Sequence, residues 1–321
     1  MRWLAACLAI TVGLCSSAAV AQTRMYRVGI LFPAGSETPG SHKLGQALAA
    51  LGYIEGRNIA YDIRAAGREV ERLPELAREL VAAKPDVIVS AAAIAARALT
   101  DATRDIPIVM ALIGDPVALG FTKSMARPTG NLTGFTTSHD TIAAKRLQLL
   151  LEMVPNARKV AFMWVPTNVQ NRLVEERTRQ AAASLNIELL SLPVATAAEI
   201  SQAIAKAESE RAAALLVAAD PLTVRNRRTI IDECQLRDLP AMHNYSFEVR
   251  DGALMSYGSD VGEDYGRAAV YVDRILKGAK VADLPFQEPT HIGLSINRRT
   301  ARSIGLTIPQ SLLIRADEVI E

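Results

Sequence analysis

Residues 114–137 read GDPVALGFTKSMARPTGNLTGFTT, and this stretch decides the fold. It follows IPIVMALI at residues 106–113, an apolar run that predicts a buried parallel strand. The stretch itself is rich in Gly, Pro, Asn and Thr, which predicts loop and turn with a short strand at residues 131–136. Strand–helix units lie on both sides of it. We therefore expect a crossover between two lobes here, with Asp115 on the wall of a cleft and Thr137 near the hinge.

The order of elements before this stretch returns after it. Residues 27–32 (RVGILF) and 159–165 (KVAFMWV) are apolar strands that each run into proline. In each half, further strands alternate with helices, which predicts parallel sheets with right-handed crossovers. In the second half this alternation includes a helix at 224–236 and a strand at 240–245. The alternative, one continuous sheet of about eight or more parallel strands, would be unusually large. We favour an α/β fold of two similar lobes, each a parallel sheet with helices on both faces.

The end of the chain comes after both halves are complete. Residues 252–258 (GALMSYG) predict a strand and residues 261–276 a helix, and a proline-punctuated polar segment follows. The economical interpretation is that the chain returns to the first lobe near Gly258 and to the second near residues 285–290, which makes a hinge of three crossovers. The expected boundaries are a signal peptide at 1–21, an N-terminal lobe of 22–137 plus 258–285, and a C-terminal lobe of 138–257 plus 286–321.

Composition and motifs exclude several classes of function. The net charge of +2 and the lack of a basic block with interleaved aromatics argue against nucleic-acid binding. The sequence contains no GxxxxGK[ST], no GxGxxG after a strand and no GxSxG, so we expect no nucleotide cofactor and no catalytic serine. Its histidines, His42, His139, His243 and His291, have no metal-ligand spacing, and we expect no metal. Cys234 reads as an inert core residue.

The first residues indicate export. Arg2, an apolar run at residues 4–14 and the small-x-small sequence AVA at 19–21 occur in the order of a cleaved signal peptide. A lipoprotein would acylate Cys15, but Leu14 is bulky where that signal needs a small residue. No later stretch reaches the ~20 apolar residues of a membrane helix. We expect a soluble, monomeric protein in the periplasm.

Candidate ligand-binding residues of the first lobe follow its strands. Ser36 follows the first strand, and Ser90, Ala91 and Ala92 follow the third and open a helix. The N–H groups at a helix start and the Ser90 hydroxyl could hold a carboxylate. The equally open alternative for Ser90 is ordinary helix capping. Asp115 either caps the turn that follows it or pairs with a cationic group of the ligand.

Candidate residues of the second lobe lie at corresponding strand ends. Asp220 ends a strand before proline, so it either caps the next helix or pairs with a ligand ammonium group. Asn168, Asn244 and Tyr245 lie at strand ends where they could exchange hydrogen bonds with a ligand. Tyr257 lies at the return crossover, where it either stacks on the ligand or fills the hinge. Thr137 completes this set at the hinge.

The chain resembles a known family over nearly all of its mature length. The segments that carry the resemblance are GYIEG at 52–56, IPIV at 106–109, GDPV at 114–117, RPTGNLTG at 127–134, KRLQLL at 145–150, LMSYG at 254–258, RILKGAK at 274–280, ADLP at 282–285, IN at 296–297, IGL at 304–306 and ADEVIE at 316–321. In this order they resemble the tryptophan/tyrosine-type substrate-binding proteins of ABC transporters. The resemblance implies a type I periplasmic-binding-protein fold, an amino acid or related small organic acid as ligand, and a membrane permease with a separate ATPase as partners.

The function that we expect is therefore capture without covalent chemistry. An extracytoplasmic receptor of this kind closes two lobes over a small molecule and delivers it to an importer. One alternative is a secreted two-lobe α/β enzyme, for which no nucleophile–base spacing is found. The other is a periplasmic sensory receptor for the same ligand class, which would need the same cleft.

Overall fold

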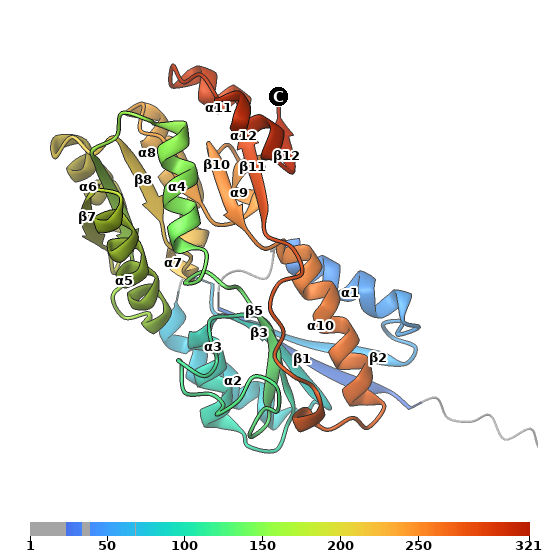
Figure 1. The fold of residues 1–321 in the computed structure, drawn as a ribbon. Coiled ribbons are helices and arrows are strands. Elements are labelled where there is room, and N and C mark those ends of the chain that lie inside the picture. Colours follow the sequence, from blue (N-terminus) through green and yellow to red (C-terminus); the bar gives the residue numbers. More distant parts are fainter. Residues whose placement is uncertain (1–23, 34–38, 68) are drawn as a thin grey trace, which may run out of the picture.

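The computed structural model describes residues 24–33, 39–67 and 69–321 (Figure 1). The expected signal peptide and Ser36 lie outside the described residues. Within those ranges, no helix combines the length and the apolar character that a bilayer crossing requires. The described chain forms two α/β lobes, each built on its own sheet, and the predicted fold class is confirmed.

The first sheet has the strand order β2-β1-β3-β4-β5, and all of its paired strands are parallel. Its strands are β1 (Tyr26–Phe32), β2 (Ile59–Ala65), β3 (Val87–Ala91), β4 (Ile108–Ile113) and β5 (Leu132–Thr136). The intervening helices are α1 (Pro39–Ala50), the 3-10 turn η1 (Val70–Arg72), α2 (Leu73–Ala82) and α3 (Ala93–Ala102).

Sequence patterns explain this first sheet directly. Strand β4 is buried along its whole length, as an apolar run between helical layers requires. Helix α2 turns Leu73, Leu76 and Leu80 toward the sheet at helical spacing. Gly134 of β5 has φ +145°, and a Cβ there would clash with the Met110 backbone. The bulge between β4 and β5 at this point therefore depends on glycine.

The second sheet has the order β12-β11-β10-β9-β8-β6-β7. Its strands are β6 (Lys159–Trp164), β7 (Glu188–Pro193), β8 (Ala214–Val217), β9 (Ala241–His243), β10 (Met255–Gly258), β11 (Gly293–Asn297) and β12 (Glu318–Ile320). Its helices are α4 (Ala143–Met153), α5 (Val169–Ser184), α6 (Ala197–Ser209), α7 (Pro221–Arg225), α8 (Arg227–Leu236), α9 (Ser246–Arg250), α11 (Arg298–Ser303) and α12 (Gln310–Arg315). Strand β11 runs antiparallel to β10, so this sheet is mixed rather than wholly parallel.

Two predicted elements of this lobe differ in the structure. The helix expected at 224–236 is two helices, α7 and α8, that meet at Asn226. Helix α7 begins earlier than expected because Asp220 and Thr223 form a capping box and Pro221 takes the first helical position. The strand expected at 240–245 ends at His243, and the turn that follows leads into the short helix α9.

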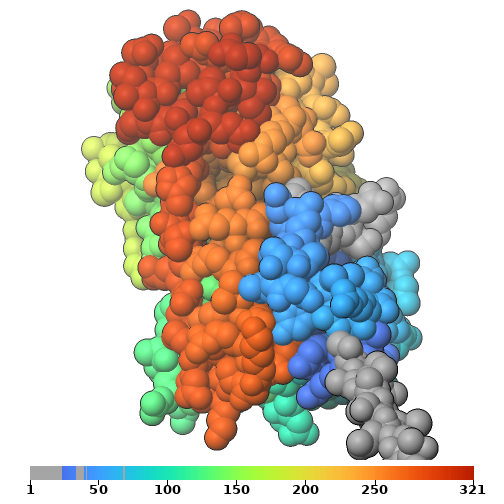
Figure 2. Space-filling view, turned by 90° about the vertical axis from the view of Figure 1, so that its right-hand side faces the viewer, coloured from blue at the N-terminus to red at the C-terminus, as the bar shows by residue number. Residues whose placement is uncertain are grey.

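Helix α10 (Val261–Leu276) lies between β10 and β11 in the sequence but packs on the first lobe, beside α1 (Figures 1 and 2). Its buried face joins Val28, Val89 and Val109 of the first sheet in one hydrophobic cluster. Burial of a side chain such as Val272 or Leu276 contributes about 1.5–3 kcal/mol, so this helix is an integral layer of that lobe. The short turn η2 (Val281–Asp283) follows it.

The chain passes between the lobes at three places that lie close together. The first passage follows β5, the second follows β10 and the third precedes β11. The first and third are hydrogen bonded to each other, since the Thr136 N–H donates to the Gln287 carbonyl (2.8 Å) and the Gln287 N–H donates to the Gly134 carbonyl (3.0 Å). Two connections that are bonded in this way can bend together as a hinge between the lobes.

Candidate functional site

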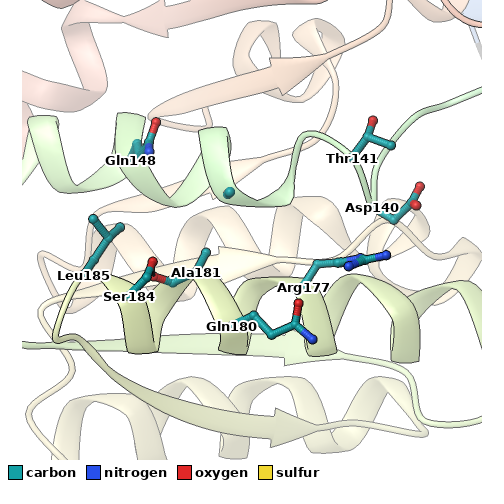
Figure 3. Close-up of a pocket in the computed structure, with 9 residues that line it drawn as sticks. Asp140, Thr141, Gln148, Arg177, Gln180, Ala181, Ser184 and Leu185 are labelled. Carbon is teal, nitrogen blue, oxygen red and sulfur yellow. Dashed lines mark hydrogen bonds between the residues drawn. The ribbon is translucent and has the colours of Figure 1, made fainter.

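Two cavities compete as the candidate site. One is a groove of about 450 Å³ between α4 and α5 (Figure 3), lined largely by exposed polar side chains such as Arg177 and Gln180 on the outside of the second lobe. The other, of about 120 Å³, lies between the lobes. The second cavity is mainly apolar, it contains several convergent polar groups, and it lies at the carboxyl ends of strands. We therefore take the interlobe cavity as the candidate site.

The wall from the first lobe is built around the turn between β3 and α3. Ala91, Ala92 and Ala93 line the cavity, and Ala92 has φ +68° at the point where the chain turns into the helix. Among the described residues no side chain caps α3. Because the first N–H groups of an α-helix have no partner within the helix, they are available to an anion in the cavity.

Ser90 does not supply the hydroxyl that the sequence suggested for this wall. It lies within β3, is fully buried and donates its hydroxyl to the Leu31 carbonyl (2.7 Å). The Ala92 N–H is likewise taken by the Leu112 carbonyl (2.7 Å). The available N–H groups are thus those of residues 93–95 at the start of α3, because Ser90 and Ala91 belong to β3 and Ala92 precedes the helix.

The opposite wall carries a carboxylate. Asp220 Oδ1 accepts from the Leu222 N–H (2.7 Å) and Oδ2 accepts from Asn168 Nδ2 (2.9 Å). Asp220 and Asn168 both line the cavity. Burial raises the pKa of Asp220, although its hydrogen bonds and the nearby Arg225 oppose that shift. The carboxylate is therefore both a helix cap and a negative group whose charge is incompletely compensated, which favours a cation beside it.

Two aromatic rings of the second lobe also line the cavity. Tyr245 and Phe247 stack with their planes 12° apart and their centroids 5.5 Å apart. Both rings also contact the hydrophobic cluster of the first lobe, which includes Tyr265 at the start of α10. The lobes thus meet across this part of the cleft, and the cavity has an aromatic surface suited to a flat apolar group.

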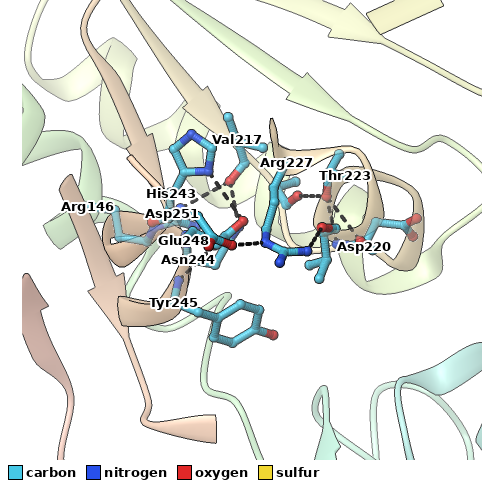
Figure 4. A network of polar contacts seen from close by, with 12 residues as sticks. Arg146, Val217, Asp220, Thr223, Arg227, His243, Asn244, Tyr245, Glu248 and Asp251 are labelled. Atoms are coloured by element: carbon cyan, nitrogen blue, oxygen red, sulfur yellow. Dashed lines mark hydrogen bonds and ion pairs between the residues drawn. The ribbon is translucent and has the colours of Figure 1, made fainter. Parts of the chain in front are cut away.

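A buried polar network holds Tyr245 in position (Figure 4). The Glu248 carboxylate accepts from the N–H groups of Tyr245 (2.9 Å) and Asn244 (3.0 Å) and contacts His243 Nδ1 (3.3 Å). Burial acts to raise the pKa of Glu248, but these hydrogen bonds outweigh it and the net shift is downward. Arg146 of α4 donates to the carbonyls of Val217 (3.1 Å) and His243 (2.9 Å), which ties together the ends of β8 and β9. Figure 4 shows the Tyr245 ring extending away from this network.

The hinge side of the cavity is closed by a glutamine. Gln170, at the start of α5, donates to the Thr137 hydroxyl (3.1 Å), and both side chains line the cavity. The Gln170 carboxamide also lies against Gly114, where an added Cβ would come 2.5 Å from Gln170 Cδ. Glycine at the end of β4 therefore permits this contact between the lobes.

The structure brings only part of the predicted set to this cavity. Ala91, Ala92, Thr137, Asn168, Asp220 and Tyr245 line it. Asp115 does not, because its carboxylate accepts from the N–H groups of Val117 and Ala118 in its own turn. Asn244 is fully buried, with its amide donating to the Val217 carbonyl. Tyr257 packs against the core of the second lobe.

Sequence reasoning missed several residues of the site. His139, Gln170, Phe247 and Tyr265 line the cavity but do not directly end a strand. A usable signal existed for Gln170, which lies two residues after the predicted strand-end residue Asn168 and accordingly in the first turn of the next helix. No group of three metal-ligating side chains occurs among the residues that the structure describes.

Comparisons with known proteins agree with this architecture. A sequence model of the family described as "ABC transporter substrate binding protein" matches residues 40–320. A tyrosine-binding protein of Clostridioides difficile (strain R20291) is 27% identical over 261 residues, which cover 81% of this chain and 75% of that protein. A conserved domain protein from Vibrio cholerae superposes with a TM-score of 0.85 at 26% identity, with 92% of this chain and 99% of that chain covered.

A second solved structure shows the same fold. It is an ABC domain from Streptococcus pneumoniae in complex with L-Trp, with a TM-score of 0.85, 24% identity, and coverage of 92% of this chain and 99% of that chain. At that level of identity the similarity concerns the fold.

Proposed function

The chain belongs to the family of ABC transporter substrate-binding proteins, and from that premise we propose that it is an extracytoplasmic receptor for an amino acid with an apolar or aromatic side chain. It holds the amino acid between its lobes and delivers it to a membrane permease that a separate ATPase drives. The family consists of substrate-binding proteins, and we propose capture and release without catalysis.

The observation that carries this proposal is the pairing of opposite walls. The start of α3 on the first lobe suits a carboxylate, because its N–H groups are uncapped by any described side chain. Asp220 on the second lobe suits an ammonium group. An α-amino acid carries both groups on one carbon atom, so it can bridge the two walls. This bridge would favour the closed arrangement of the lobes over the open one.

The lining between those walls supports the choice of side chain. Phe32, Tyr245, Phe247 and Tyr265 surround the space with aromatic surface. An apolar or aromatic ligand side chain gains from leaving water in such a cavity, whereas a strongly polar one would lose its hydration. The similarity to a tyrosine-binding protein supports the same choice.

Contacts across the cleft support capture by closure. Arg225 of α7 donates to the Gly67 carbonyl of the first lobe (2.6 Å), and Gln170 reaches Thr137 at the hinge. A monomer provides both walls of this cavity, so the proposed function needs no second copy. Export would use the signal peptide expected at residues 1–21, which lie outside the described residues.

A thermal-shift screen of residues 22–321 tests the function. The screen would use the common L-amino acids, with sugars and polyamines as controls. A ligand that binds only the folded state at 100 times its Kd stabilises it by about 2.7 kcal/mol. We expect a clear rise in Tm with apolar or aromatic amino acids and no product after long incubation. Turnover would point to an enzyme instead, and a rise only with sugars would refute the ligand class.

A further inference from the structure

The head-group contacts proposed at α3 and Asp220 leave one pair of side chains in the cavity, His139 and Tyr245, unused. His139 lies just after the hinge residue Thr137, lines the cavity and is only 3% exposed. Its Nε2 lies 3.2 Å from the Tyr245 hydroxyl, and the two rings meet edge to face with centroids 5.6 Å apart. His139 Nδ1 is buried and has no hydrogen-bond partner among the described residues.

Both members of the pair are uncharged. Burial, reinforced by the positive charge of Arg146, lowers the pKa of His139 to about 3. Burial likewise raises the pKa of the Tyr245 phenol above its usual value. Near neutral pH the imidazole therefore carries one N–H proton and the phenol keeps its O–H proton.

The missing partner at Nδ1 leaves the imidazole tautomer open. In a histidine, the hydrogen bond that one ring nitrogen makes normally decides which nitrogen carries the proton. With the proton on Nε2, His139 donates to Tyr245, and the Tyr245 O–H is left to donate into the cavity. With the proton on Nδ1, Tyr245 donates to His139, and its oxygen is left to accept. Since no described group binds Nδ1, either form is available.

We propose that His139 and Tyr245 form the selectivity element of the cavity, and that this element favours a ligand whose ring carries a hydrogen-bonding group over the same ligand without it. This inference rests on the proposed function, because it concerns the side-chain end of an amino acid held at Asp220 and α3. Tyr245 contacts the ligand, whereas His139 is a positioning residue that holds the Tyr245 hydroxyl by a hydrogen bond.

The expected size of the selectivity follows from how the pair is bonded. A site that leaves a buried polar group wholly unpaired rejects the wrong ligand by factors of about 10⁴ or more. Tyr245 keeps its bond to His139 when the ligand offers no partner, so that full penalty does not apply. One net hydrogen bond between neutral groups then corresponds to about tenfold in Kd.

Isothermal titration calorimetry with L-tyrosine and L-phenylalanine measures this selectivity, because the two ligands differ only in the ring hydroxyl. The ratio of their Kd values would be compared among the wild type, Tyr245→Phe and His139→Leu. Tyr53→Phe is the matched control, since it removes a buried phenol that bonds Asp273 in the core of the first lobe and does not line the cavity.

We expect the wild type and Tyr53→Phe to bind L-tyrosine about tenfold more tightly than L-phenylalanine. Tyr245→Phe should lose that preference while it still binds L-phenylalanine, which shows that the variant folds. His139→Leu leaves the Tyr245 hydroxyl without its partner when L-phenylalanine is bound, so its preference for L-tyrosine should exceed that of the wild type. An unchanged preference in His139→Leu would refute the role of His139. Equal affinities in the wild type, or a preference that survives in Tyr245→Phe, would overturn the inference and leave the proposed function intact. If no amino acid of the thermal-shift screen binds the wild type, the proposed function and this inference both fall.

Discussion

Replacement of Asp220 by asparagine separates its observed role as helix cap from its proposed role as partner of the ligand. Asparagine has the same shape and caps helices about as well as aspartate, so the hydrogen bond from the Leu222 N–H is retained. The negative charge, however, is lost. Because burial raises the pKa of Asp220 in the empty protein, removal of the charge also relieves a desolvation cost. Asparagine has one acceptor oxygen, however, so the bond from Asn168 Nδ2 is lost. The relieved desolvation offsets part of this loss, and we expect the free energy of unfolding to fall by no more than about 1–3 kcal/mol.

The affinity for an amino acid should fall much further. A hydrogen bond that involves a charged group contributes about 1.5–3 kcal/mol, which corresponds to roughly 10- to 150-fold in Kd. A plain carboxylic acid with the same side chain lacks the ammonium group and should bind both proteins alike. Calorimetry with L-tyrosine and with 3-(4-hydroxyphenyl)propionate, its analogue without the amino group, measures the two effects separately.

Asp115→Asn is the matched control for this experiment. Asp115 caps its own turn through the Val117 and Ala118 N–H groups, as Asp220 caps α7, but it does not line the cavity. We expect Asp115→Asn to leave both affinities unchanged. An equal loss of affinity for both ligands in Asp220→Asn, or no loss for either, would refute the pairing of Asp220 with an ammonium group.

Three further changes test the closed arrangement and its electrostatics. Gly114→Ala places a methyl group 2.5 Å from Gln170 Cδ, so Gln170 must move. We expect up to about tenfold weaker binding, because the hydrogen bond from Gln170 to Thr137 is displaced. An unchanged Kd would show that this contact is dispensable. Arg225→Ala removes the bond to the Gly67 carbonyl and should raise koff about tenfold in stopped-flow release, whereas an effect on the association rate alone would contradict a role in holding the lobes closed. Burial is the main cause that raises the pKa of Asp264 to about 7, so stability is lost as the pH rises from about 4 to about 7, where the unfolded chain has released a proton that the folded chain keeps. Asp264→Asn should remove this dependence and be more stable than the wild type by up to about 4 kcal/mol at pH 8 in urea unfolding, with little difference near pH 4; an equal difference at both pH values would disprove it.

The sequence by itself determined the alternation of strands and helices, the division into two lobes and the strand ends that face the cleft. These features follow from local periodicity and from turn residues, which do not depend on distant contacts. Asp220, Asn168 and Tyr245 were predicted in this way, and the structure places them on one cavity. Their roles as ligand contacts remain predictions.

Tertiary structure alone decided which of the strand-end side chains face that cavity. The Ser90 hydroxyl is used by Leu31 of the neighbouring strand, and Asp115 satisfies the N–H groups of its own turn. A polar side chain that bonds a nearby backbone group is no longer available to a ligand. Whether it makes such a bond depends on the path of the turn in the folded chain.

The sequence also did not predict the residues that close the cavity from other parts of the chain. Gln170 reaches Gly114 and Thr137 only because the lobes meet, and Tyr265 joins the site because α10 crosses back to the first lobe. His139 and Tyr245 are 106 residues apart, yet their side chains form one hydrogen-bonded pair. Periodicity describes which face of an element is apolar, but the packing of two lobes against each other decides which distant side chains share a cavity.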